Sequence, residues 1–317
     1  MYYLGIDLGG TTIKVGVIDE NNQIIATAKR KTRVPCAPED MCEQLASTAF
    51  EALDNAKISI DDVPWVGIGT PGTVNTDLGV VEFSNNLSFN HFELRKLLEA
   101  RMNKKVFVEN DANAAAYGEY QAGALKGAKN ALAITLGTGV GSGIIIDGKI
   151  YAGSNFGAGE MGHTVIAYKG RHCSCGRDGC WETYASASGL IRTTKEAMGK
   201  SDDHGSPIWK LVSGDISNVD GRTAFDAMRA GDPIGKAVVD EYIDYLGCGL
   251  ANCINTFQPD ILCIGGGICN EGETLMKPLR EYIAGQAYSV SSQGQTKLCK
   301  AQLGNDAGII GAALLGK

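Results

Sequence analysis

Two stretches of the chain alternate apolar and polar residues in the same way. Residues 3–29 read YLGID, LGGTT, IKVGVID, a polar turn and QIIATAK, which predicts three short strands joined by tight turns. From residue 131 the plan is repeated as ALAIT, LGTGVGSG, IIID and IYAG, with Asp147-Gly148 as a hairpin turn. Two copies of one β-meander predict two related α/β domains that face each other across a cleft.

Helical spacing is found between and after these stretches. Apolar residues recur every third or fourth position in 39–57, an Ala-rich run follows the apolar segment 105–110, and residues 305–317 are rich in small residues. The last segment predicts a closely packed helix that returns to the first domain. We therefore expect residues 1–117 with 303–317 to form one domain and residues 118–302 the other. Residues 200–220 are the most loop-like stretch, and no chemistry is assigned to them.

Composition narrows the class of protein. The 317 residues include 29 basic and 36 acidic ones, a net charge of −7 that disfavours nucleic acid as a partner. The chain starts directly with a strand pattern, without a secretory leader, and no apolar run approaches the roughly 20 residues that span a bilayer. We expect a cytoplasmic protein with reduced cysteines and no membrane partner.

Four residues have the spacing of a metal site. Cys173, Cys175 and Cys180 form a C-x-C-x4-C pattern, and His163 precedes them. One imidazole and three thiolates fill the tetrahedral positions of Zn²⁺, so the site would be structural. Cysteines are often small buried apolar residues instead. Here they lie in a polar run whose glycines suit tight turns, which favours metal.

The glycine turns of the two meanders offer exposed backbone N–H groups and threonine hydroxyls that suit polyphosphate oxygens. Neither turn has the G-x-G-x-x-G spacing of a dinucleotide fold, and Ile150 stands where a P-loop needs Ser or Thr. A single turn of this kind is more often a plain hairpin. Two matched copies, each with threonine, favour phosphate binding.

Asp111 stands where a buried strand is predicted to pass into a helix. An aspartate at this position suits an N-cap. The helix N-terminus also favours the ionised carboxylate, so the same residue could accept a proton. The amide of Asn110, the strand end Thr70–Gly72 and the neutral polar segment Ser84–Phe89 supply groups that match sugar hydroxyls.

Six motifs in this order resemble the ROK (repressor, open reading frame, kinase) sugar kinases, and among them the bacterial glucokinases, over essentially the whole chain. They are DLGGTTIK (7–14), ENDANAAA (109–116), LGTGVGSG (136–143), GEMGH (159–163), CSCGRDGCWE (173–182) and IGGG (264–267). The resemblance implies the fold of the actin and hexokinase superfamily. In this fold two ribonuclease H-like α/β domains flank a nucleotide- and sugar-binding cleft.

The resemblance also implies a role for each matching position. Asp111 would be the general base of phosphoryl transfer, and His163 would use one ring nitrogen for zinc and the other for the sugar. The hexose-binding set is Gly72, Asn86, Asn110, Asp111, Glu160, His163 and Glu182. The ATP-binding set is Asp7, Gly9, Gly10, Thr11, Thr12, Lys14, Gly137, Thr138, Gly139, Gly265, Gly266 and Gly267, with Asp7 holding Mg²⁺ through water. The turn at Gly265–Gly267 could also be a plain strand-to-helix connection.

The implied function is ATP-dependent phosphorylation of a hexose at its 6-hydroxyl by a homodimer or higher homo-oligomer. GEMGH resembles the E-x-G-H of glucose-preferring members, which favours glucose, whereas SNNLSFNHF does not closely match the loop expected there. Mannose, allose, fructose, N-acetylglucosamine and N-acetylmannosamine remain alternatives. The family also contains sugar-responsive repressors with an N-terminal helix-turn-helix domain. Only six residues precede Asp7, which disfavours that function.

Overall fold

The computed structural model describes residues 1–317, which divide into two compact units. The first unit comprises Met1–Ala133, Ser142–Gly159 and Ala301–Lys317, and the second comprises Ile134–Gly141 and Glu160–Lys300. The boundary predicted after residue 117 falls inside a continuous helix, α3 (Asp111–Ala122). That helix belongs to the first unit as a whole.

Two five-stranded sheets have corresponding strand orders. The first is β3-β2-β1-β4-β8 and the second is β11-β10-β9-β12-β13. The strands of the first are β1 (Tyr3–Leu8), β2 (Thr12–Ile18), β3 (Ile24–Lys31), β4 (Val66–Thr70) and β8 (Val106–Asn110). Those of the second are β9 (Ala131–Leu136), β10 (Val140–Ile146), β11 (Lys149–Ile150), β12 (Ile261–Gly265) and β13 (Lys297–Lys300). The predicted duplication is therefore confirmed, as is the Asp147-Gly148 hairpin, whose two residues have φ of 50° and 78°.

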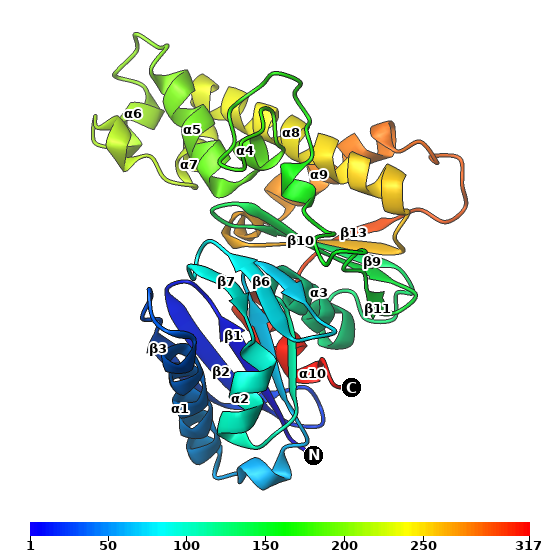
Figure 1. The fold of residues 1–317 in the computed structure, drawn as a ribbon. Helices are drawn as coiled ribbons and strands as arrows, with labels where there is room; N and C mark the ends of the chain where they lie inside the picture. The colour runs from blue at the N-terminus through cyan, green and yellow to red at the C-terminus, as the bar shows by residue number, and fades with distance from the viewer. The chain divides into compact units, whose positions relative to one another are not determined.

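Helices cover both faces of the first sheet (Figure 1). On one face, α1 (Pro38–Ala56) and α2 (Leu94–Met102) bury the apolar residues of β1, including Leu4, Ile6 and Leu8. This is the core that the 39–57 spacing predicts. A small three-stranded sheet, β5 (Thr73–Asn75), β6 (Val80–Ser84) and β7 (Phe89–Phe92), adds Val74, Val81 and the β7 phenylalanines to the same core.

On the opposite face lie α3 and α10 (Ala307–Leu314), and glycines allow them to pack closely. A Cβ on Gly67 would lie 1.7 Å from the carbonyl oxygen of Ala312, and one on Gly311 would lie 1.7 Å from that of Ala114. Alternation along β1 turns Asp7 toward this face, where a Cβ on Gly308 would lie 3.5 Å from its carboxyl carbon. The C-terminal helix thus belongs to the first unit.

The second unit is mainly helical (Figure 1). Its longest helix, α8 (Pro233–Phe257), contacts four others. The helices are α4 (Glu182–Ala185), α5 (Ala187–Met198), α6 (Pro207–Leu211), α7 (Thr223–Arg229), α8 and α9 (Glu273–Gln286). Its short 3-10 turns are η2 (Met161–His163), η3 (Ile216–Asn218) and η4 (Gly267–Glu271). Two more, η1 (Ile60–Asp62) and η5 (Gly304–Asp306), belong to the first unit. The stretch expected to be a loop, 200–220, contains α6 and η3, because Ile208 and Trp209 are buried beside α7. None of the helices combines the length and the apolar character that crossing a bilayer requires.

Candidate functional site

The carboxyl ends of three parallel strands place the first group of predicted site residues together. In the register of β1, β4 and β8, Asp7 pairs with Gly69 and Gly69 pairs with Glu109. A Cβ on Gly69 would lie 3.5 Å from the Cα of Asp111. One strand therefore separates Asp7 from the start of α3. Ligands bind at this edge in open α/β sheets.

Asn110, and not Asp111, caps α3. Its backbone is extended (φ −62°, ψ 145°), and its amide oxygen accepts hydrogen bonds from the N–H groups of Ala112 and Asn113, at 2.9 and 3.1 Å. Its Nδ2 donates to the carbonyl oxygen of Gly72 at 3.1 Å. Since an amide nitrogen has two N–H groups, one of them is left for a ligand. The N-cap interpretation of Asp111 is therefore wrong, and its carboxylate lies in the first turn of the helix, where the dipole favours its charge.

Two buried hydroxyls lie beside this cap. Thr70 is the register partner of Asn110, and a Cβ on Gly72 would lie 2.9 Å from that of Ser84. Both hydroxyls are buried, and neither has a hydrogen-bond partner in the structure. Buried polar groups are normally satisfied, so unsatisfied ones at a strand edge indicate a place where a ligand or water binds.

The first glycine turn is tight and is held from its flanks. The N–H of Gly9 donates to the carbonyl oxygen of Thr12 at 3.0 Å, and the Thr32 hydroxyl donates to that of Gly9 at 2.7 Å. A Cβ on Gly10 would lie 3.4 Å from Asn86, so the turn and the predicted sugar-binding loop are neighbours. Thr11 is exposed and Thr12 partly exposed.

Asp7 and Lys14 form an ion pair next to this turn. Their side chains lie 3.4 Å apart on register partners of β1 and β2. Burial raises the pKa of Asp7, and the ammonium of Lys14 opposes part of that shift. A half-buried carboxylate at a phosphate turn is the kind of oxygen ligand that Mg²⁺ prefers, often through water. Asp7 therefore fits the magnesium ion that a nucleotide would bring.

The second glycine turn is attached to Glu182. The N–H of Val140 donates to Oε2 of Glu182 at 2.9 Å, and a Cβ on Gly139 would lie only 2.2 Å from that oxygen. The N–H of Ala187 donates to the carbonyl oxygen of Gly137 at 2.9 Å. A side chain at position 139 would therefore displace the carboxylate of Glu182, a residue predicted to bind the sugar.

A pocket of about 450 Å³ opens beside this turn in the second unit. It is lined by Leu136, Gly137, Thr138, Ala187, Asp220, Gly221, Arg222, Gly267, Ile268, Asn270 and Glu271. The two predicted nucleotide-binding segments therefore meet in one hollow, and a Cβ on Gly266 (φ 107°) would lie 2.0 Å from the carbonyl oxygen of Leu136. The volume of this pocket lies within the range of small-molecule binding sites.

Sequence reasoning missed the polar wall of this pocket. Asp220 ends the stretch to which no chemistry was assigned, Arg222 follows shortly after it, and Asn270 and Glu271 lie in η4. Glu271 is paired with Arg229 of α7 at 2.5 Å. Scattered charged residues without a motif carry no signal of their own. The position of Asn270 and Glu271 shortly after the Gly265–Gly267 turn is the one feature that could have indicated them.

The four predicted metal ligands come together. One ligand atom from each of His163, Cys173, Cys175 and Cys180 lies within 4.8 Å of the others. The Sγ atoms of Cys175 and Cys180 are 3.6 Å apart, and Nδ1 of His163 is 3.6 Å from Sγ of Cys173. A tetrahedral zinc site has S–S and S–N edges of about 3.8 and 3.6 Å. The donor set and its geometry therefore fit Zn²⁺.

The loop that carries these cysteines is fixed to α8. Trp181 directly follows Cys180, is fully buried and donates its indole N–H to the carbonyl oxygen of Tyr245 at 2.9 Å. A Cβ on Gly249 would lie 2.0 Å from the indole ring. Because Glu182 follows Trp181, the same anchor fixes the start of α4.

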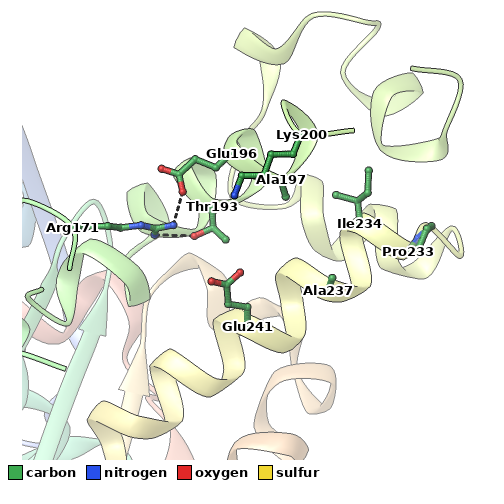
Figure 2. A pocket seen from close by; sticks show the side chains of 9 residues that line it. All are labelled: Arg171, Thr193, Glu196, Ala197, Lys200, Pro233, Ile234, Ala237 and Glu241. Carbon is green, nitrogen blue, oxygen red and sulfur yellow. Dashed lines mark hydrogen bonds and ion pairs between the residues drawn. The ribbon is translucent and has the colours of Figure 1, made fainter. Parts of the chain in front are cut away.

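A second hollow of the same unit, about 420 Å³, lies between the cysteine loop, α5 and α8 (Figure 2). Arg171 lies at one end of it, where its guanidinium is 2.8 Å from the Glu196 carboxylate, bonds the Thr193 hydroxyl and stacks over the ring of Tyr184. The rest of the hollow is lined by Ala197, Lys200, Pro233, Ile234, Ala237 and Glu241. None of the predicted site residues lines this hollow. Arg171 links the cysteine loop to α5 through Thr193 and Glu196.

The residues predicted to bind sugar, nucleotide or metal thus form one group in each unit. The first unit holds Asp7, Gly9, Gly10, Thr11, Thr12, Lys14, Gly72, Asn86, Asn110 and Asp111. The second holds Gly137, Thr138, Gly139, Glu160, His163, Glu182, Gly265, Gly266, Gly267 and the three cysteines. Glu160 is exposed and directly precedes η2, which ends at His163.

Comparison with known proteins identifies the family. The model of the ROK family matches residues 3–317. The chain belongs to the ROK family. It is 38% identical to a glucokinase of Thermotoga maritima over 311 residues, which cover 98% of this chain and 95% of the relative. It is 32% identical to the N-acetylgalactosamine kinase AgaK of a Shewanella species, over 100% of this chain and 96% of the relative.

Solved structures agree with this assignment. The ROK family glucokinase of Streptomyces griseus, crystallised with glucose and AMPPNP, aligns with a TM-score of 0.81 and 36% identity over 99% of this chain and 98% of its own. The predicted fold class, that of the two-domain ROK sugar kinases, is confirmed.

Proposed function

We propose that this ROK protein transfers the γ-phosphoryl group of ATP to the 6-hydroxyl of a hexose, with glucose as the preferred substrate. Its class is that of the ATP-dependent sugar kinases, as the glucokinase relatives indicate. The observation that carries the proposal is the pairing of a phosphate-suited turn with a carboxylate. The turn after Asp7 and the carboxylate of Asp111 lie one strand apart at the carboxyl edge of the first sheet.

In this proposal Asp111 accepts the proton of the attacking hydroxyl. Its place in the first turn of α3 favours the ionised form, and Asn110 performs the capping. The remaining N–H of Asn110 donates to a sugar hydroxyl, and the buried Ser84 hydroxyl gains the partner that it lacks. A base of this kind contributes about 10²–10⁴-fold to turnover.

Glu160, His163 and Glu182 complete the hexose site in the proposal. Nδ1 of His163 faces the Cys173 sulfur, so Nε2 is the nitrogen that remains for the sugar. Zinc, when bound, supplies no catalysis but fixes the ring of His163 and the course of the loop toward Glu182. Glu182 has Oε1 available for a hydroxyl, because Oε2 accepts the Val140 N–H.

The nucleotide is proposed to occupy the pocket between the Gly137–Gly139 turn and Gly267. The polar wall of Asp220, Arg222, Asn270 and Glu271 offers donors and acceptors for a ribose or a base. The first glycine turn and Lys14 bind the phosphates, and Asp7 would hold the Mg²⁺ that accompanies them, whose charge would offset that of the phosphate oxygens. We further propose that the enzyme acts as a homodimer or higher homo-oligomer.

The second candidate substrate class is the N-acetylhexosamines. The observation that favours it is the 32% identity to an N-acetylgalactosamine kinase over the whole chain. A pocket that hydrogen-bonds a 2-hydroxyl discriminates against a substrate that lacks this group, because the buried partners remain unpaired. The two classes therefore separate sharply in kinetics.

A coupled assay of ADP release with a panel of hexoses and N-acetylhexosamines tests the proposal. We expect kcat/KM to be highest for glucose, and at least about tenfold lower for mannose, fructose and each N-acetylhexosamine. A higher kcat/KM for an N-acetylhexosamine would establish the second class. Absence of turnover with every sugar, in protein that binds ATP, would contradict kinase activity altogether.

A further inference from the structure

A buried carboxyl group directly precedes the proposed catalytic turn. Glu109 is 6% exposed, and its Oε1 accepts hydrogen bonds from the N–H of Asn110 at 2.8 Å and from Nδ2 of Asn113 at 3.1 Å. Burial raises the pKa of Glu109, because the ionised form loses its water. A carboxyl group that is costly to bury, and that makes no proposed contact with substrate, requires another role.

The hydrogen bonds of Glu109 hold the two asparagines on either side of Asp111, Asn110 and Asn113. Asn110 is held at its backbone N–H by Glu109 and at its side chain by Gly72 and by the first turn of α3. Asn113 is held at its own N–H by the Asn110 side chain and at Nδ2 by Glu109. Asp111 lies between these two asparagines, so its backbone cannot shift without breaking one of these bonds.

Asn113 also reaches the segment that leads to Glu160. It is 3% exposed, and its Cα would lie 3.2 Å from a Cβ on Gly143. Because Nδ2 is directed to Glu109, Oδ1 is directed away from it. This oxygen is buried without a hydrogen-bond partner, 3.8 Å from the position of a Cβ on Gly159. The Ser142 hydroxyl meanwhile donates to the carbonyl oxygen of Gly159.

We propose that Glu109 and Asn113 are positioning residues, which hold the Asp111 turn against Gly159 so that the carboxylate stays aligned with the reacting hydroxyl. In the substrate-bound state Oδ1 of Asn113 accepts the N–H of Gly159. Neither residue touches the substrate. This inference rests on the function proposed above, because it assigns a role within the same reaction.

A positioning role predicts a specific kinetic signature. Alignment contributes to the transition state more than to ground-state binding, and small misplacements cost about 10²-fold in rate. We expect Glu109→Ala and Asn113→Ala each to lower kcat about 10–100-fold, while the dissociation constant for glucose changes less than about threefold. The double variant should be no slower than the worse single variant, because the two residues act as one unit.

The matched control lies at the other end of the same helix. Glu119 is 3% exposed, and its carboxylate accepts the N–H groups of Ala124, Gln302 and Leu303. Glu119→Ala should lower the melting temperature while kcat of the folded protein stays within about twofold of wild type. Glu109→Gln keeps an acceptor for both N–H donors and should restore kcat to within about fivefold of wild type.

Steady-state kinetics, glucose titration and thermal unfolding on the same preparations test the inference. Equal losses in kcat for Glu109→Ala and Glu119→Ala, multiplicative losses in the double variant, or an effect confined to the sugar KM would each overturn it. Wild-type turnover is measured first. A wild type that phosphorylates no sugar contradicts the proposed function, whereas an active wild type with unaffected variants contradicts only the positioning role.

Discussion

Oε2 of Glu182 accepts the backbone N–H of Val140 at 2.9 Å, so a residue proposed to bind the sugar is hydrogen-bonded directly to the second glycine turn. Glu182 also follows Trp181, which anchors the end of the cysteine loop to α8. One carboxylate therefore connects three parts of the second unit: the proposed nucleotide pocket, the proposed hexose-binding residues of this unit and the cysteine loop. A change at any of the three is expected to reach the others through this side chain.

The first prediction concerns Gly139. A Cβ at this position would lie 2.2 Å from Oε2 of Glu182, so Gly139→Ala must displace the carboxylate. We expect the KM for ATP and the dissociation constant for glucose both to rise, each by about tenfold or more. Initial-rate kinetics and glucose titration measure the two effects.

Gly285→Ala is the matched control for this prediction. Gly285 lies in α9 of the same unit, and a Cβ there meets no atom within 4 Å. In a helix this substitution should raise stability by about 0.5–1 kcal/mol and leave both constants unchanged. If Gly139→Ala affects ATP alone, Glu182 does not couple the two sites.

The second prediction isolates the proposed base. Asp111→Asn keeps the shape of the side chain but removes the proton acceptor, so kcat should fall about 10²–10⁴-fold. Glucose should bind within about threefold of wild type, because Asn110 caps the helix and an asparagine at 111 keeps an oxygen for the Ala112 N–H that the Asp111 carboxylate accepts at 2.9 Å. Near-normal turnover in this variant would remove Asp111 from its role. Asp147→Asn, at an exposed hairpin turn, controls for the loss of one acidic residue.

The sequence predicted those parts of the fold that depend on local residue patterns, and not those that depend on packing between distant segments. Local patterns of polarity and turn residues predicted the duplicated meanders, α1 and the Asp147-Gly148 hairpin, because each depends on residues that are close in sequence. The boundary predicted after residue 117 lies within α3, because no change in composition marks the unit to which a helix belongs. Packing of Gly118 against Ala307, nearly two hundred residues later, decides it.

The candidate site shows the same division. The cluster of His163 and the three cysteines was predictable because its members fall in one short, polar segment of the sequence. The polar wall of the nucleotide pocket was not, since Asp220 and Arg222 are brought to Gly137 only by the tertiary fold. Asp111 was correctly placed at the start of α3, but its cap was misassigned. The choice between Asn110 and Asp111 depends on backbone angles, and both residue types cap helices equally well.

The third prediction concerns the metal. Elemental analysis should find about one zinc per chain, and prolonged chelation or Cys175→Ser should release it. The melting temperature and glucose affinity should then both fall, because His163 and the loop before Glu182 lose their anchor. Cys253→Ser, a buried cysteine of α8 outside the cluster, should lower stability without loss of zinc. Protein that is metal-free yet fully folded and active would contradict the site.

The last prediction uses the buried carboxyl group of Glu109. Burial raises its pKa in the folded protein above the ordinary value of 4.5. The folded state therefore holds this proton more tightly than the unfolded chain. The resulting stability is fully present below the unfolded pKa and is lost as pH rises through the folded pKa. Glutamine does not titrate, so the free energy of unfolding of Glu109→Gln should increase relative to that of wild type as the pH rises from the unfolded to the folded pKa. Above the folded pKa the difference between the two proteins should stay constant. Urea denaturation from pH 4 to pH 8 measures the difference, with Glu51→Gln on the exposed side of α1 as the control. A difference that is constant, or that grows toward acid pH, would show that the carboxyl group is not held protonated by burial.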